Sequence, residues 1–309
     1  MLSAEPAAPK PKRSVRSRLP GLLLKIVITL VCFWYIATKI DFSKAFAALT
    51  RANAAYLFVA LIFFIVSKLL SAVRLNIYFR NIGLQLPSRT NLRLYWLGMF
   101  YNLFLPGAIS GDAYKVVLLN RRLKAPYKKT SAAVLLDRFS GVIALGVILS
   151  AYGIVVLHNP LYDVILIAGA ILAFAGFYFV VRFLLRDFLA GFFPTFLWGL
   201  TVQLAQVVCI YFILLSLHLS LQPEWIFIFL ASAVISVLPI SLGGGLGTRE
   251  VVFAEGARFF NLDPQLAVVV SLLFYLLTVL GSVWGLYYNF HDPFAGLDDA
   301  VAQPETLTH

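Results

Sequence analysis

The sequence predicts an all-α polytopic integral membrane protein, with about six full spans and two re-entrant broken-helix hairpins arranged as an inverted repeat. Of the 309 residues, 61% are hydrophobic and only 13% are charged, and the mean hydropathy is +0.88. Several apolar runs reach the ~20 residues that a helix needs to cross a bilayer. This composition excludes a sizeable water-soluble catalytic domain, because the segments between the runs are too short to fold a core of their own.

The apolar runs divide the chain into a basic tail at 1–19, a single transmembrane domain at 20–290 and an acidic tail at 291–309. The first run is too long for a signal peptide and no small-residue cleavage site follows it, so we expect it to remain as the first span. The full spans are expected near residues 20–38, 54–73, 131–157, 161–182, 195–217 and 264–290.

Two further apolar stretches, at 90–122 and 225–260, are interrupted at their centres by Pro and Gly, which leaves each arm too short to cross the membrane. Basic residues lie on both flanks of the first stretch, starting with Arg74 before it and ending with Lys129 after it. Positively charged loops prefer the cytoplasmic side. A hairpin keeps both basic clusters inside, whereas a full span would export one of them.

This topology predicts that both termini are cytoplasmic and that the second hairpin enters from the external face. Residues 54–157 and 195–290 then each contain a span, a hairpin and a span, in opposite orientations. A loop with Lys39, Lys44 and Arg51 would lie outside, which argues against the scheme. Inverted repeats with broken helices are typical of transporters, whose substrate site lies where the breaks meet near the midplane.

The two interrupted turns are expected to form the binding site, because irregular backbone at membrane depth must be buried or line a watery cavity. A half-helix follows each turn, with Ser110 or Thr248 as its N-cap, and its free N–H groups can bind phosphate. Asp112 and Glu250 lie in the first turns of these half-helices. Each acid either stabilises the helix N-terminus or faces a wet functional site.

Four further charged positions extend this predicted site. Asp137 and Arg138 open the next span, and because adjacent helical residues point about 100° apart, one can face the cavity while the other pairs elsewhere. Arg138 and Arg249 either bind a lipid phosphate or extend to the membrane interface. Lys115 lies three residues after Asp112 on the same helical face and can neutralise it.

Other functional classes find little support in the sequence. The basic residues adjoin apolar runs, which suits anionic lipid headgroups better than nucleic acid. Both cysteines lie in apolar runs, the four histidines have no neighbouring metal ligands, and the glycines at 243–247 do not form GxGxxG. We therefore expect no metal, no cofactor and no nucleic-acid partner.

Three segments resemble the lysylphosphatidylglycerol synthase transmembrane-region family, the flippase half of a group of bifunctional proteins. They are NLFLPGAISGDAYKVVLLNRR at 102–122, SAAVLLDRFSG at 131–141 and LPISLGGGLGTREVVF at 238–253. The positions that match the family motifs are Asn102, Pro106, Gly107, Gly111, Asp112, Asp137, Arg138, Gly244, Gly245, Gly247 and Glu250. Ser110 replaces the first Gly of a Gly-Gly-Asp, and Lys115 stands near a position where Arg is usual.

The resemblance, which extends from about residue 20 to 290, implies translocation of a lipid between the leaflets of a cell (inner) membrane. The partners would be membrane lipids, either an anionic phospholipid or a polyprenyl-phosphate-linked lipid. Larger members append an aminoacyl transferase domain, and about twenty residues follow the last span here, so we expect a transporter rather than an enzyme. Two alternatives stay open: an intramembrane enzyme with Asp112 and Asp137 as its acid/base pair, and a non-transporting accessory membrane protein.

Overall fold

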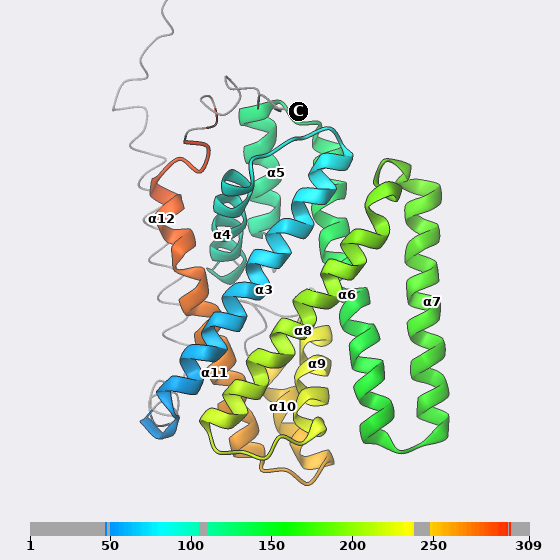
Figure 1. The fold of residues 1–309 in the computed structure, drawn as a ribbon, viewed down its shortest axis with the longest axis vertical. Coiled ribbons are helices and arrows are strands. Elements are labelled where there is room, and N and C mark those ends of the chain that lie inside the picture. The colour runs from blue at the N-terminus through cyan, green and yellow to red at the C-terminus, as the bar shows by residue number, and fades with distance from the viewer. Residues whose placement is uncertain (1–46, 48–49, 105–109, 238–247, 296, 298–309) are drawn as a thin grey trace, which may run out of the picture.

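The structure, a computed structural model, describes residues 47, 50–104, 110–237, 248–295 and 297, which form a bundle of helices (Figure 1). Within these residues, five segments are long and apolar enough to cross a membrane: Ala54–Asn81, Tyr127–Leu157, Pro160–Leu184, Arg186–Ser216 and Pro264–Phe290. They coincide with five of the six expected spans, so the all-helical, multi-pass membrane fold class is confirmed. The expected first span at 20–38 and the tail at 1–19 lie outside the described residues.

Helices α3 (Ala54–Asn81) and α8 (Phe192–Ser216) make the most extensive helix contact in the described chain. The side chain of Asn53 caps α3 by accepting a hydrogen bond from the N–H of Ala55 at 3.0 Å. We expected this span to end near residue 73, but α3 continues to Asn81. The reason is that no helix-breaking Pro or Gly occurs before Gly83, which has a φ of +78°.

Helix α6 (Tyr127–Leu157) packs against α8 and α9, and α7 (Pro160–Leu184) lies at the outer edge of the bundle beside α6 (Figure 1). Asn159 begins α7 by accepting a hydrogen bond from the N–H of Leu161 at 3.0 Å, and Pro160 follows as the first helical residue. Large apolar side chains such as Ile171 and Leu172 on α7 are exposed. In a membrane this helix therefore faces lipid over most of its surface.

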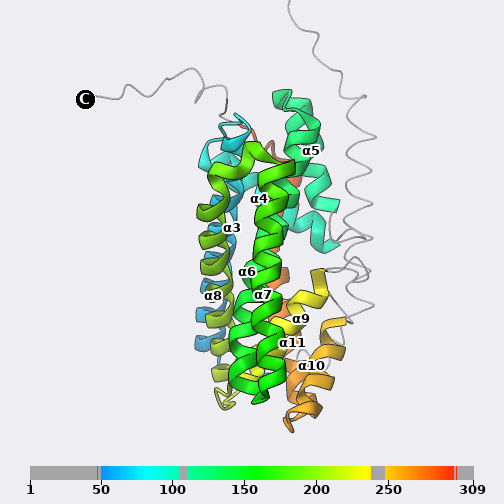
Figure 2. The same ribbon diagram turned by 90° about the vertical axis from the view of Figure 1, so that its right-hand side faces the viewer.

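Two pairs of short helices occupy the positions of the predicted hairpins. The first pair is α4 (Ser88–Phe104) and α5 (Ser110–Leu123), and the second is α9 (Pro223–Val237) and α10 (Thr248–Phe259). The members of each pair pack together, and the two pairs lie toward opposite ends of the molecule (Figures 1 and 2). None of these four helices reaches the ~20 residues that a full crossing needs.

The last expected span, at 264–290, is divided into α11 (Pro264–Ser282) and α12 (Trp284–Phe290). Helix α12 packs closely on α4, because a Cβ atom added to Gly285 would lie 2.2 Å from the carbonyl oxygen of Trp96. The indole Nε1 of Trp96 donates a hydrogen bond to the carbonyl of Gly281 at 2.9 Å. These contacts join α4 to α11 and α12. The short 3-10 segment η2 (Arg186–Gly191) connects α7 to α8.

Candidate functional site

Asp112, in the first turn of α5, is the centre of a buried ion cluster. Its side chain is only 7% exposed, and its Oδ1 lies 2.7 Å from Nζ of Lys115, which confirms the predicted neutralisation across one helical turn. Its Oδ2 accepts a hydrogen bond from Nε of Arg138 on α6. The Arg138 side chain is 27% exposed, so it is the most accessible member of this cluster. Asp112 thus connects α5 to the long helix α6.

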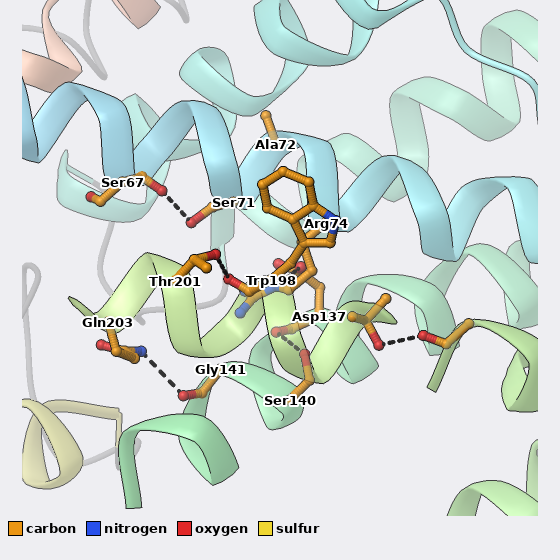
Figure 3. A network of polar contacts seen from close by, with 12 residues as sticks. Ser67, Ser71, Ala72, Arg74, Asp137, Ser140, Gly141, Trp198, Thr201 and Gln203 are labelled. Carbon is orange, nitrogen blue, oxygen red and sulfur yellow. Dashed lines mark hydrogen bonds and ion pairs between the residues drawn. The ribbon is translucent and has the colours of Figure 1, made fainter. Parts of the chain in front are cut away.

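Asp137, the neighbour of Arg138, binds a different cation. Its Oδ1 accepts a hydrogen bond from Nε of Arg74 on α3 at 2.7 Å, and both side chains are buried (Figure 3). Glycines make room for this guanidinium, since a Cβ atom at Gly141 would lie 3.1 Å from Nη1 of Arg74. The expectation that Asp137 and Arg138 face different directions is confirmed. Our placement of Arg74 in a cytoplasmic basic flank is wrong, because α3 extends past it and buries it against α6.

Tyr95 of α4 lies between the two ion pairs. Nζ of Lys115 is 5.0 Å from the centroid of its ring, and its hydroxyl interacts electrostatically with both Asp112 and Asp137. The cluster therefore holds three cations, on Arg74, Lys115 and Arg138, against two carboxylates. Counted over the described residues of the cluster, one positive charge is in excess, which favours the binding of an anion there.

The start of α5 is positioned by α4. A Cβ atom at Gly111 would lie 2.0 Å from the carbonyl oxygen of Gly98, so only glycine at position 111 lets the two backbones approach this closely. The N–H of Gly111 donates to Oδ1 of Asn102 at 2.8 Å, and Oγ of Ser110 donates to the carbonyl of Tyr101 at 3.2 Å. We expected Ser110 to act as the N-cap, but it is the first residue of α5. Asn102 instead satisfies one of the amide groups at this helix end.

The second hairpin presents a different charge arrangement. Oε1 of Glu250, in the first turn of α10, accepts a hydrogen bond from Oγ of Ser271 on α11 at 3.1 Å. Arg249 is 6% exposed, and its guanidinium lies 4.5 Å from the ring centroid of Phe274 and 5.7 Å from that of Phe229. This burial excludes the alternative in which Arg249 extends to the membrane interface.

Part of the predicted site lies outside the described residues: Pro106, Gly107, Gly244, Gly245 and Gly247. Thr248 begins α10, but its side chain is also outside the described part. The structure adds three residues that our sequence interpretation missed, namely Lys68, Arg74 and Tyr95. The sequence feature that could have identified Lys68 and Arg74 is a cation within an apolar run or at its end. Placing a charged side chain there costs free energy unless the residue is paired or functional.

A cavity of about 520 Å³ is lined by residues of α10 and α11 and by residues that precede α3, and neither Asp112 nor Glu250 is among its lining residues. Its lining includes Arg51, Arg258 and Gln265 together with apolar side chains. Within the described ranges, no three His, Cys, Asp or Glu side chains gather into a group that could hold a metal ion.

Comparison with known proteins identifies the group to which the sequence belongs. A family model described as the lysylphosphatidylglycerol synthase TM region matches residues 22–193 and 186–285. The chain belongs to this family. A relative from Pyrococcus horikoshii, named UPF0104 membrane protein PH1989, is 22% identical over 324 aligned positions, which cover 85% of this chain and 94% of the relative. No solved structure matches the chain significantly.

Membership of the lysylphosphatidylglycerol synthase transmembrane-region family confirms the resemblance found in the sequence. It also agrees with the helical, membrane-spanning architecture, and the Pyrococcus relative is itself described as a membrane protein. The two matched segments include both pairs of short helices.

Proposed function

We propose that this protein is a lipid transporter that moves a phospholipid or a polyprenyl-phosphate-linked lipid between the two leaflets of a cell membrane. The observation that carries the proposal is the ion cluster around Asp112, in which a buried carboxylate at a half-helix N-terminus holds one buried and one accessible cation. Ionisable side chains at membrane depth cost ~2.5–3.5 kcal/mol or more, so they usually mark a substrate or ion pathway.

The cluster offers a simple way to bind and release a phosphate group. Arg138 is held by Asp112, and its partial exposure makes it the cation that an entering phosphate meets first. A phosphate oxygen that binds Arg138 replaces one charge-assisted hydrogen bond by another, so neither state leaves a buried charge unpaired. The positive end of the α5 dipole and the one excess cation favour entry of the anion.

The second hairpin would perform the corresponding step from the opposite side. Support comes from the position of the two hairpins toward opposite ends of the molecule (Figure 2) and from the acid in the first turn of each returning helix. In this proposal, residues 54–157 and 195–290 form an inverted repeat and the lipid headgroup passes between the hairpins near the midplane. The acyl chains stay in the bilayer, and both termini are cytoplasmic.

The charge pairing favours transport over an acid/base reaction between Asp112 and Asp137. General acid/base catalysis needs one protonated and one ionised group. Here Asp112 is paired with Lys115 and Arg138, and Asp137 is paired with Arg74. The two carboxylates therefore bind separate cations and are not arranged as a pair that shares one proton.

The test is leaflet exchange of fluorescent phosphatidylglycerol in proteoliposomes that contain the purified full chain. We expect Asp112→Asn and Glu250→Gln each to slow exchange at least tenfold. Asp292→Asn is the matched control, because Asp292 pairs with Arg122 in an exposed position. Exchange at the rate of the unmodified protein in both site variants would remove these acids from the mechanism.

A further inference from the structure

Two cations, Lys68 on α3 and Arg249 on α10, have no ion-pair or hydrogen-bond partner among the described residues. The Lys68 side chain on α3 lies with Nζ 4.7 Å from the ring centroid of Phe64. Arg249 on α10 is only 6% exposed, and its Nε is buried without a hydrogen-bond partner. Among the described residues, neither side chain forms an ion pair or a hydrogen bond.

These two cations share one aromatic surface. Lys68 lies over the ring of Phe64, and Arg249 lies over the ring of Phe274. These two rings pack edge to face with their centroids 5.8 Å apart. Phe229 completes the surface at 5.0 Å from Phe274. Lys68 and Arg249 are close enough for their like charges to repel each other, and both lie near the buried side chain of Cys209. The two side chains therefore belong to one site.

The surroundings do not compensate for this concentration of positive charge. A cation over an aromatic ring gains about 0.5–2 kcal/mol, which is less than the several kcal/mol that burial of an unpaired ion costs. Glu250 acts on Arg249 electrostatically, but its Oε1 is bonded to Ser271. Among the described residues, two cations against one carboxylate leave a single positive charge in excess, so a ligand with one negative charge would balance the site.

We propose that Lys68 and Arg249 form an anion site for a phosphodiester ligand whose net charge is −1, separate from the Asp112 cluster. Arg249 supplies planar hydrogen-bond donors suited to two phosphate oxygens, and Lys68 supplies a point charge. The rings of Phe64, Phe229 and Phe274 would exclude water from the contacts between the two cations and the bound phosphate. The positive end of the α10 dipole would attract the same anion. The identification of the ligand as a lipid headgroup rests on the proposed transport function, whereas the anion site does not.

The test is native mass spectrometry of the full chain released from vesicles of dioleoyl phosphatidylglycerol or dioleoyl phosphatidylcholine. Both lipids carry the phosphodiester, but only phosphatidylglycerol has a net negative charge. We expect the unmodified protein to retain at least tenfold more phosphatidylglycerol. Equal retention of the two lipids would overturn the proposal without any variant.

Variants then assign the retained lipid to this site. We expect Lys68→Gln and Arg249→Gln each to reduce retention of phosphatidylglycerol at least tenfold, and Arg249→Lys to restore part of it. Arg186→Gln is the control, since Arg186 is an exposed cation in η2. Unchanged retention of phosphatidylglycerol by a monodisperse Lys68→Gln protein would overturn the site. Lys68 is half-buried, so we expect its replacement to disturb folding less than replacement of Arg249.

A thermal-shift titration with inorganic phosphate separates the two sources of this anion. The lipid assignment would be overturned if inorganic phosphate stabilises the unmodified protein but not Lys68→Gln, while the unmodified protein retains no phosphatidylglycerol. The outcomes also separate this site from transport. Unchanged retention in Lys68→Gln alongside exchange that depends on Asp112 would refute only the anion site, whereas lost retention without any exchange by the unmodified protein would refute only transport.

Discussion

Arg74 and Asp137, 63 positions apart in the chain, form a buried ion pair with an Nε–Oδ1 distance of 2.7 Å. The pair joins α3 to α6 and is adjacent to the Asp112 cluster through Tyr95. Breaking a buried pair by removing one partner is strongly destabilising, because the remaining charge stays buried without compensation. The pair therefore supports the scaffold on which the candidate site is built.

Replacement of either partner should measure this contribution. We expect Arg74→Gln or Asp137→Asn to lower the free energy of unfolding by about 3–5 kcal/mol. The exposed pair Lys129–Asp187, with side chains 53% and 49% exposed, is the control, and Lys129→Gln should cost less than about 1 kcal/mol. Denaturation in mixed micelles followed by circular dichroism provides the measurement. If the buried and the exposed pair cost the same free energy of unfolding, burial does not increase the contribution of the Arg74–Asp137 pair to stability.

The close approach of α4 and α5 should make Gly111 intolerant of a methyl group. The Cβ atom of Gly111→Ala would lie 2.0 Å from the carbonyl oxygen of Gly98, so the helices must separate. We expect this variant to lose about 1–3 kcal/mol of stability. Gly169→Ala on α7 is the matched control, because a Cβ atom there meets nothing within 4 Å. A control variant that is neutral or more stable fits the higher helix propensity of alanine, whereas tolerance of alanine at position 111 would contradict the close packing.

Arg138 should be sensitive to charge in the transport assay. We expect Arg138→Gln to slow leaflet exchange of phosphatidylglycerol at least tenfold, and Arg138→Lys to keep part of the rate, because a lysine retains the charge but not the planar donor geometry. Arg122→Gln serves as the control, since Arg122 is an exposed cation paired with Asp292. If Arg138→Gln and Arg122→Gln behave alike, the Arg138 guanidinium is not a phosphate ligand.

Apolar length and helix geometry predicted much of the fold and part of the site. Runs of apolar residues located five described spans, and the Pro- and Gly-containing interruptions located both short helix pairs. The three-residue spacing predicted the ion pair between Lys115 and Asp112, and the 100° rotation between neighbours predicted the separate directions of Asp137 and Arg138. These features are local, so the sequence contains them directly.

The long-range contacts could not be predicted in the same way. The pairing of Arg74 with Asp137 depends on how α3 crosses α6, and hydropathy does not encode this crossing. The same limit applies to Lys68 and Arg249, which lie in different halves of the chain and meet across an aromatic surface. The hydrogen bond from Gly111 to Asn102 joins residues close in the chain, but predicting it requires the relative position of α4 and α5.

The measurement that tests the central claim most directly compares lipid exchange in liposomes that contain the unmodified chain with exchange in protein-free liposomes. A fluorescent phosphatidylglycerol is placed in both leaflets, and a membrane-impermeant quencher then reports how much of the inner-leaflet label becomes accessible with time. The account predicts that about half of the label is lost at once in protein-free liposomes and nearly all of it when the protein is present, because the lipid reaches the outer leaflet. A protected inner-leaflet fraction in the presence of folded protein, equal to that of protein-free liposomes, would contradict lipid transport.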